Sequence, residues 1–320
     1  MDKTINTLPH NQSGLRPRVE RAFLSLLRLY TFHTPIAKGK FRISDVALRL
    51  CKYPPERVEV PTKDGRRLYA NLGTGIEGLL FFQGTYETAL TEKVSMLVRD
   101  GDVCIDVGAN FGWYTTLLRK LCGSSGAVHA FEPVPPIYDE LVDNYRLMGS
   151  PPNVFLHNLA LGDAPGEIEV NLFTGLSTGH ASMSDRGRDD ATAFKCKIVT
   201  FDSYLSDRGI GPVDFVKVDI EGAEILFLRG AGSLFEQEVP PIILMEMALE
   251  QTGNFGYKPD DLLRFMNERA PYHFYAVNEY TGTIKLITGF APDDIGANVF
   301  CIPKGFYQDR TERFLLDLAH

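Results

Sequence analysis

Short apolar runs alternate with amphipathic segments through the middle of this chain. The apolar runs have the length of buried strands, and the segments between them have the 3.6-residue spacing of helices. The predicted core strands are 103–107, 127–131, 154–159, 213–220 and 242–246. The predicted helices are 87–98, 113–121, 135–148, 223–228 and 259–269. Alternation of this kind predicts an α/β fold with a parallel sheet covered on both faces.

Other segments have the two-residue period of strands with one exposed face. Residues 166–173 and 194–200 alternate in this way and are predicted to be antiparallel. The loop 174–193 between them is rich in Gly, Ser, Asp and Arg, and we interpret it as a candidate substrate lid. An Asp-Gly turn predicts a hairpin over 57–72. The last predicted strands are 272–278, 283–287 and 298–302.

Composition and charge divide the chain unevenly. At 320 residues and 44% hydrophobic, it can form one large domain with an appendage. We expect a basic, mainly helical extension at 1–56 and a domain at 57–320, with its core at about 85–303. Residues 1–52 contain ten basic and three acidic side chains, a net charge of +7. Because the whole chain has a net charge of −8, the remaining residues have a net charge of −15. An acidic domain argues against a nucleic-acid partner.

Features of membrane and secreted proteins are missing from the sequence. It has no apolar run of transmembrane length, no secretory signal, and five cysteines without metal-site spacing, so we expect a cytoplasmic location. Within the basic extension, Phe23, Leu26, Leu27 and Tyr30 follow helical spacing. This pattern favours a helix packed on the domain, and peripheral membrane contact through residues 18–32 is the alternative.

A glycine loop follows the first core strand. It reads Asp106-x-Gly108-x-Asn110-x-Gly112, and Glu132 ends the next strand about twenty residues later. In doubly wound sheets, glycines let the backbone approach a ligand, and an acid at the second strand accepts the ribose hydroxyls. The spacing therefore predicts a cofactor that contains adenosine.

The loop also indicates which cofactor. Asn110 stands where a dinucleotide fingerprint has its second glycine, and no P-loop Lys-Ser/Thr follows. Asp106 suits a cationic amino group better than a phosphate. The helix start near Tyr114 and Thr115 offers N–H groups to a carboxylate. An amino group, a carboxylate and a ribose together describe S-adenosyl-L-methionine, with a nicotinamide-dependent oxidoreductase as the alternative.

A second cluster is charged where a buried strand is normally apolar. Lys217, Asp219 and Glu221 are two residues apart, so a strand would project them from one face, and Glu246 ends the neighbouring strand. A lysine and an acid that only neutralise each other would be the structural explanation. The position at the carboxyl end of the sheet, where such folds bind ligands, favours a functional one.

The ordered set of motifs resembles the FkbM family of S-adenosylmethionine-dependent methyltransferases over about residues 80–250. The motifs are Gly84-x-Tyr86-Glu87, the loop 106–112, Phe131-Glu-Pro133, Asn158-x-Ala160-Leu-Gly-Asp163, Thr200-Phe-Asp-Ser-Tyr204, the segment 214–224 and Met245-Glu246. The resemblance implies the class I methyltransferase fold, in which parallel strands are followed by an antiparallel pair. It also implies methyl transfer to a hydroxyl of a sugar, glycan or secondary metabolite, and adds Glu87, Asn158 and Ala160 as cofactor candidates.

Methyl transfer to a hydroxyl calls for a base. Asp219 is the first candidate, and it is also a cofactor candidate; Glu246 and Glu221 come next. Lys217 would hold Asp219 ionised or contact the acceptor oxygen, and His180 in the loop is a rival base. A divalent metal held by Asp219 and Glu246 would be another route, which the sequence does not require. A protein that binds the cofactor without catalysis is a further alternative.

Overall fold

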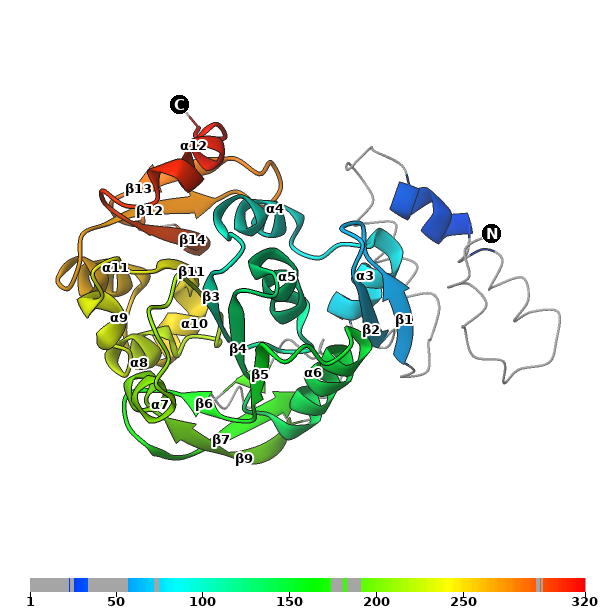
Figure 1. Cartoon of the computed structure of the whole chain (residues 1–320), viewed down its shortest axis with the longest axis horizontal. Coiled ribbons are helices and arrows are strands. Elements are labelled where there is room, and N and C mark those ends of the chain that lie inside the picture. The colour runs from blue at the N-terminus through cyan, green and yellow to red at the C-terminus, as the bar shows by residue number, and fades with distance from the viewer. Residues whose placement is uncertain are drawn as a thin grey trace.

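The computed structural model describes residues 23, 26–33, 57–71, 75–173, 181–182, 191–291, 294 and 296–319. At its centre is an eight-stranded sheet with the strand order β13-β12-β14-β11-β10-β3-β4-β5 (Figure 1). The parallel strands are β3 (Val103–Val107), β4 (Ala127–Phe131), β5 (Val154–His157), β10 (Phe215–Val218) and β11 (Ile242–Ala248). Antiparallel pairing joins β14 (Gly296–Pro303) to β11 and to β12 (Tyr272–Val277), and β12 to β13 (Ile284–Ile287). An antiparallel strand inserted beside five parallel ones is the Rossmann-like plan of class I methyltransferases, so the expected fold class is confirmed.

Helices cover both faces of the sheet, because side chains of the central strands alternate between two hydrophobic clusters. Cys104 faces the first cluster and Ile105 faces the second, and both are fully buried. The first cluster contains side chains of α4 (Thr88–Leu97), α5 (Trp113–Cys122) and α12 (Gln308–Leu315) and is flanked by α6 (Pro135–Leu147). The second contains side chains of α7 (Phe201–Arg208), α8 (Glu224–Arg229), α9 (Ser233–Glu236) and α11 (Pro259–Asn267). A further helix, α10 (Leu249–Asn254), follows β11 directly.

A smaller sheet has the order β6-β9-β7-β8. It consists of β6 (Ala160–Leu161), β7 (Gly166–Phe173), β8 (Ala181–Ser182) and β9 (Ala191–Val199), and the predicted antiparallel pairing is that of β7 with β9. The strand predicted over 154–159 ends at His157, because Ala160 and Leu161 pair with β9 instead. The predicted loop 174–193 contains β8 and the start of β9; residues 174–180 and 183–190 lie outside the described residues, and the lid hypothesis lies there with them.

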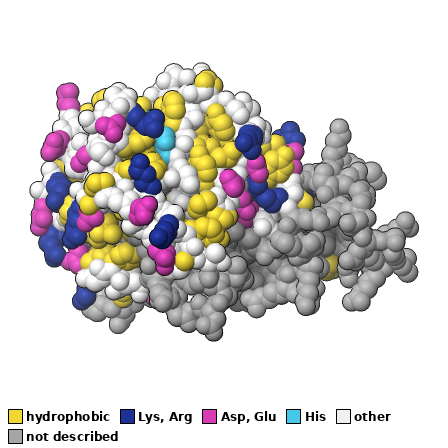
Figure 2. All heavy atoms as spheres, turned by 90° about the horizontal axis from the view of Figure 1, so that it is seen from below, with side chains coloured by type: hydrophobic (Ala, Val, Ile, Leu, Met, Phe, Trp, Pro, Cys, Tyr) yellow, Lys and Arg dark blue, Asp and Glu magenta, His cyan; other side chains and the backbone are white. Residues whose placement is uncertain are grey.

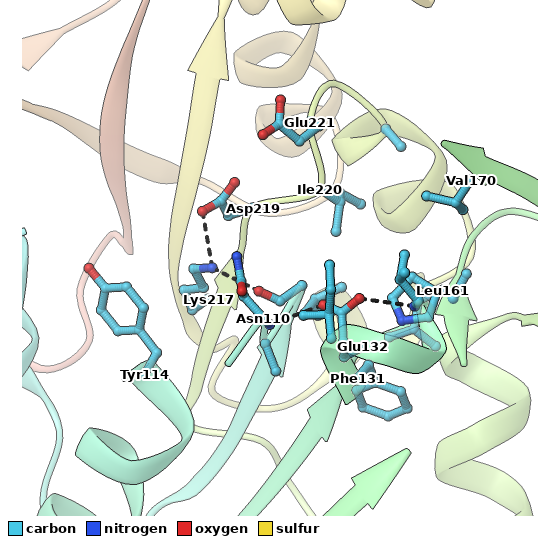
Figure 3. A pocket seen from close by; sticks show the side chains of 18 of the residues that line it. Asn110, Tyr114, Phe131, Glu132, Leu161, Val170, Lys217, Asp219, Ile220 and Glu221 are labelled. Carbon is cyan, nitrogen blue, oxygen red and sulfur yellow. Dashed lines mark hydrogen bonds and ion pairs between the residues drawn. The ribbon is translucent and has the colours of Figure 1, made fainter. Parts of the chain in front are cut away.

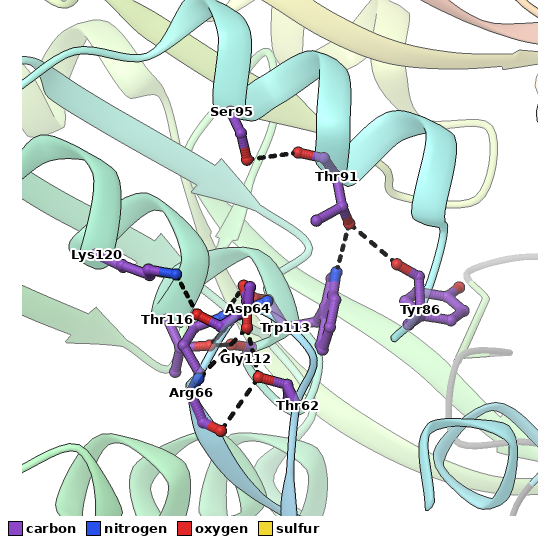
Figure 4. Close-up of polar contacts among 10 residues, drawn as sticks. All are labelled: Thr62, Asp64, Arg66, Tyr86, Thr91, Ser95, Gly112, Trp113, Thr116 and Lys120. Carbon is purple, nitrogen blue, oxygen red and sulfur yellow. Dashed lines mark hydrogen bonds and ion pairs between the residues drawn. The ribbon is translucent and has the colours of Figure 1, made fainter. Parts of the chain in front are cut away.

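The predicted N-terminal hairpin is present as β1 (Arg57–Pro61) and β2 (Arg67–Asn71). Its turn is fixed to the start of α5 by Arg66, whose Nη1 donates to the Trp113 carbonyl and to Thr116 Oγ1, both at 2.6 Å (Figure 4). The guanidinium also lies 4.1 Å from the centre of the Trp113 ring. The hairpin is thus docked by a buried cation and leads into α3 (Gly75–Gln83), a helix that the sequence analysis missed.

Residues 26–33 are helical and lie beside α3. The helix packs on the domain, as expected, through Arg28 and Thr31. Its apolar residues do not make this contact as a group, because Phe23, Leu26 and Tyr30 are exposed and only Leu27 of the four contacts the hydrophobic cluster. None of the described helices is long and apolar enough to cross a membrane.

Candidate active site

A cavity of about 990 Å³, including the part open to solvent, lies at the carboxyl ends of β3, β4 and β10 (Figure 3). Its walls come from the glycine loop, the residues after β4, the strands β6 and β7, and the turn after β10. Between β3 and β10 the order of the parallel strands reverses. Open α/β sheets bind ligands at this switch point.

The glycine loop is pressed against the turn that carries Asp219. Gly108 has a φ of +77°, and a Cβ at this position would lie 1.9 Å from the Asp219 carbonyl oxygen. Asn110 is also left-handed, with a φ of 50°, and its Oδ1 accepts a hydrogen bond from the Phe111 N–H at 2.7 Å. Glycine at 108 is therefore required by contact between two backbone segments, in addition to any approach of a ligand.

Glu132 is buried at the wall of the cavity. Its two carboxylate oxygens accept hydrogen bonds from the N–H groups of Asn110 and Val134, each at 3.0 Å. Burial raises the pKa of this carboxyl to about 7. Each oxygen keeps a second lone pair for a ligand hydroxyl. Because the Asn110 N–H is already bonded to Glu132, it is not free to bind a pyrophosphate as a dinucleotide loop would.

An apolar wall stands beside Glu132. It comprises Val134, Ile137, Leu161, Ile168 and Val170. These side chains come from the start of α6 and from the small sheet, which places hydrocarbon where a flat heteroaromatic ring can pack. The sequence analysis missed this wall, although the alternation in 166–173 already set Ile168 and Val170 on one face of their strand.

Asp106, Thr115 and Gly112 support the glycine loop from behind and do not line the cavity. Asp106 is fully buried, and its Oδ2 accepts a hydrogen bond from Thr115 Oγ1 at 2.6 Å. Its Oδ1 has no hydrogen-bond partner among the described residues, and burial raises its pKa. A Cβ on Gly112 would lie 2.7 Å from Leu141, so this glycine makes room for α6.

Lys217 and Asp219 come together at the end of β10. Lys217 Nζ lies 3.2 Å from Asp219 Oδ2 and donates to the Gly108 carbonyl at 3.2 Å. Burial alone would lower the pKa of Lys217, but the charges of Asp219, Asp106 and Glu87 outweigh burial and raise it. The ammonium is thus a permanent cation that ties the base candidate to the glycine loop.

The two remaining acids of the cluster differ in their surroundings. Burial and the neighbouring Asp219 raise the pKa of Glu246 to about 9, so it is protonated at neutral pH. Glu221 follows the end of β10 in a left-handed conformation, with a φ of 56°, and accepts a hydrogen bond from Gln251 Nε2 at 2.9 Å. It lies above the Lys217–Asp219 pair in Figure 3 and also lines the cavity, so all three charged residues of the predicted cluster reach it.

Tyr114 connects this cluster to the segment before α4. Its hydroxyl donates to Glu87 Oε2 at 2.6 Å, and Lys217 Nζ lies 5.2 Å from the centre of its ring. Burial raises the pKa of Glu87 to about 7. Tyr86 and Tyr114 line the cavity, whereas Glu87 lies behind them. Glu87 therefore orients Tyr114 beside Lys217.

The remaining candidates are placed as follows. Asn158 Nδ2 donates to the carbonyls of Glu132 and Pro133, both at 2.9 Å, and so fixes the turn after β4. Ala160 lines the cavity. His180 lies outside the described residues. Among the described residues, no group of three or more His, Cys, Asp or Glu side chains could hold a metal ion.

The model of the methyltransferase FkbM domain matches residues 106–274, which include the glycine loop, Glu132, the Lys217–Asp219 pair and Glu246. The chain belongs to the FkbM methyltransferase family. The family resemblance expected from the motifs is therefore confirmed, over more than half of the chain.

Two named methyltransferases are similar to part of the chain. The hexuronic acid methyltransferase AglP of Haloferax volcanii is 24% identical over 169 residues, 53% of this chain and 63% of AglP. The 31-O-demethyl-FK506 methyltransferase FkbM of Streptomyces tacrolimicus is 28% identical over 162 residues, 42% of this chain and 60% of that protein. The chain thus spans about three fifths of the length of these two relatives. The crystal structure of methyltransferase FkbM from Methylobacillus flagellatus KT aligns with a TM-score of 0.42 at 16% identity, covering 63% of this chain and 44% of that one.

Proposed function

We propose that the protein is an S-adenosylmethionine-dependent O-methyltransferase that acts on a hydroxyl of a sugar, a glycan or a secondary metabolite, with 57–320 as its catalytic unit. The main support for this proposal is that one cavity is lined both by Glu132, the proposed ribose ligand, and by the Lys217–Asp219 pair, which contains the proposed base. The two named relatives are described as methyltransferases of a hexuronic acid and of 31-O-demethyl-FK506. Both descriptions agree with an oxygen acceptor.

The residues fit this cofactor. Glu132 would accept the ribose hydroxyls on its two free lone pairs, and the wall formed by Leu161, Ile168 and Val170 would pack against the adenine. The backbone of the glycine loop and the carboxylate of Asp219 would hold the amino-acid end. When bound, S-adenosylmethionine supplies an electrophilic methyl group.

The chain's own residues would then orient the acceptor and take its proton. Orientation can supply about 7–11 kcal/mol of the barrier, and a positioned base adds about 10²–10⁴-fold. Asp219 is the base we propose, because it lines the cavity and pairs with Lys217, whereas burial and the neighbouring Asp219 raise the pKa of Glu246 and favour its protonated form. Glu246 would instead donate a hydrogen bond beside it, so the two carboxyl groups take different roles. Lys217 would hold the Asp219 carboxylate toward the cavity.

Three alternatives are less well supported. An oxidoreductase would need N–H groups free for a pyrophosphate, and that of Asn110 is bonded to Glu132. A binding protein without catalysis has no need for the buried Lys217 and its acids. An RNA methyltransferase would be expected to carry a basic stripe, whereas acidic, basic and hydrophobic side chains are interspersed on the described part of the face in Figure 2.

The test has two stages. Calorimetry should detect S-adenosylmethionine binding and no comparable binding of NAD; the reverse preference would exclude the proposal. Transfer of labelled methyl groups to a panel of neutral sugars, uronic acids and hydroxylated metabolites would then identify an acceptor, and loss of transfer after exhaustive chelation would indicate a metal.

With that acceptor, Asp219→Asn should lower kcat by about 10²–10⁴-fold. Asp207→Asn, on the exposed side of α7, is the matched control and should turn over normally. Full activity of Asp219→Asn would remove the base assignment and leave the cofactor assignment standing.

A further inference from the structure

The helix at 26–33 exposes an apolar face. The exposed fractions are 53% for Phe23, 67% for Leu26, 53% for Leu29 and 46% for Tyr30. At 100° per residue these positions share one side of a helix. Four large apolar side chains on one helical face form a patch of the kind that marks an interaction site. We call it the 23–30 face.

Polar bonds on the opposite side fix this orientation. Arg28 Nε donates to the Phe81 carbonyl at 2.8 Å, and Thr31 Oγ1 donates to the Phe82 carbonyl at 2.6 Å. Both carbonyls belong to the last turn of α3, where carbonyls lack partners within their own helix. Arg28 and Thr31 are buried. The helix is therefore inverted, with its polar side packed inward and its apolar side facing outward.

Two partners could cover the 23–30 face, a second copy of the chain or a lipid surface, and the net charge of the N-terminal residues favours the lipid surface. The sequence around it, residues 1–52, carries a net +7, and the rest of the chain −15. A second copy of the chain would bring two such basic segments together, which repel each other. An anionic lipid surface would attract them and accept the apolar side chains at the headgroup boundary.

We propose that the 23–30 face binds an anionic membrane surface, so that the protein acts as a peripheral membrane protein. Phe23, Leu26, Leu29 and Tyr30 enter the headgroup region, and the net positive charge of residues 1–52 attracts the anionic lipids. The helix lies beside α3 and the hairpin, at the end of the molecule away from β12 and β13 (Figure 1). This contact requires neither methyl transfer nor cofactor.

The experiment is vesicle sedimentation of the full chain. Vesicles of phosphatidylcholine with phosphatidylglycerol should bind the protein, vesicles of phosphatidylcholine alone should bind it far less, and added salt should weaken binding. The double variant Leu26→Ser with Leu29→Ser should lose at least about tenfold in partitioning. Its matched control, Leu316→Ser with Leu286→Ser, replaces two leucines that are 80% and 47% exposed on another part of the molecule and should bind as the wild type does.

Each contrary result has a defined meaning. Absence of binding to the anionic vesicles, or equal binding by the Leu26/Leu29 variant and the wild type, overturns the proposal. A concentration-dependent dimer in lipid-free solution that the Leu26/Leu29 variant loses would assign the face to self-association and overturn it too. Since exposed positions are changed, the thermal midpoint of the variant should match that of the wild type, which separates lost binding from lost folding.

Discussion

At the residue scale, Glu132 shows how a carboxylate can be held rigid and still bind. The N–H groups of Asn110 and Val134 orient both of its oxygens, and Asn158 fixes the turn after β4 that supplies the Val134 N–H. The carboxylate therefore needs no rearrangement when hydroxyl groups arrive. Such preorganisation is what allows a buried group to contribute affinity.

We predict that Glu132→Gln weakens S-adenosylmethionine binding by roughly 10- to 100-fold, because hydrogen bonds to a charged group are worth about 1.5–3 kcal/mol. Calorimetry with both proteins measures the change. Glu140→Gln, a substitution of a carboxyl on the neighbouring α6, provides the control. Affinity within about twofold of the wild type would mean that the ribose lies elsewhere.

Spacing in the sequence identified the residues of the site but not the direction of every side chain. Glu132, Asp219 and Lys217 reach the cavity, as a strand-end position predicts. Asp106 is the last residue but one of β3, yet its buried carboxylate accepts a hydrogen bond from Thr115 and does not line the cavity. Glu221 also lines the cavity, but it lies beyond the end of β10 at Val218, and its left-handed conformation breaks the two-residue alternation of the strand.

At the element scale, the hairpin β1–β2 is docked by several side chains, among them the buried Arg66. Arg66 bonds to the first turn of α5 and stacks on Trp113, whose indole N–H donates to Thr91 Oγ1 at 3.1 Å. Thr91 in turn bonds to the carbonyl of Tyr86 at 3.0 Å (Figure 4). A chain of contacts thus runs from the hairpin to a residue of the cavity wall.

Arg66→Ala should destabilise the protein by about 2–4 kcal/mol, because it leaves buried acceptors at Trp113 and Thr116 without their donor. Arg67→Ala is the adjacent control: Arg67 is exposed and pairs with Glu59 at the surface, so its loss should cost less than about 1 kcal/mol. Denaturant unfolding measures both. Equal effects would show that the docking contact carries no particular stability.

The long periodic elements could be predicted, and the short ones could not. The strands 103–107 and 127–131 match β3 and β4 residue for residue. By contrast, β6 has two residues and is defined by its partner β9, which no local pattern reveals. The inverted helix at 26–33 follows from the unsatisfied carbonyls of α3, a tertiary demand that overrides amphipathic spacing.

At the scale of the whole molecule, a buried histidine pair joins the central sheet to α7. The Tyr204 hydroxyl lies 2.7 Å from His129 Nδ1 on β4 and 2.6 Å from His157 Nε2 on β5. Burial, and secondarily Arg208, lowers the pKa of both imidazoles to about 4. The folded protein therefore holds them neutral, whereas the unfolded chain binds protons at its ordinary value of 6.5.

Stability from this cluster should be lost as pH falls from 6.5 toward 4, because the unfolded state binds more protons in that window. Carboxyls with raised pKa, such as Glu132, act in the opposite direction, so a variant difference isolates the histidines. His157→Gln keeps a nitrogen near Tyr204 without a proton to gain. As the pH falls from 6.5 toward 4, the free energy of unfolding of the variant should rise by roughly 1–2 kcal/mol relative to that of the wild type.

His273→Gln is the matched control, because His273 on β12 is only partly buried, and it should show a much smaller change. Denaturant midpoints across the pH range measure both variants. A constant difference between His157→Gln and the wild type would mean that the cluster does not titrate on folding.

The contact between Gly108 and the Asp219 carbonyl has a consequence for redesign of the cavity. The loop proposed to hold the cofactor and the turn that carries the proposed base touch through bare backbone, so neither can be reshaped without moving the other. Libraries aimed at new acceptors should therefore leave this junction unchanged and vary the walls that no such contact constrains, such as Ile168 and Tyr86. A selection that changes position 108 would lose binding and turnover in a single step.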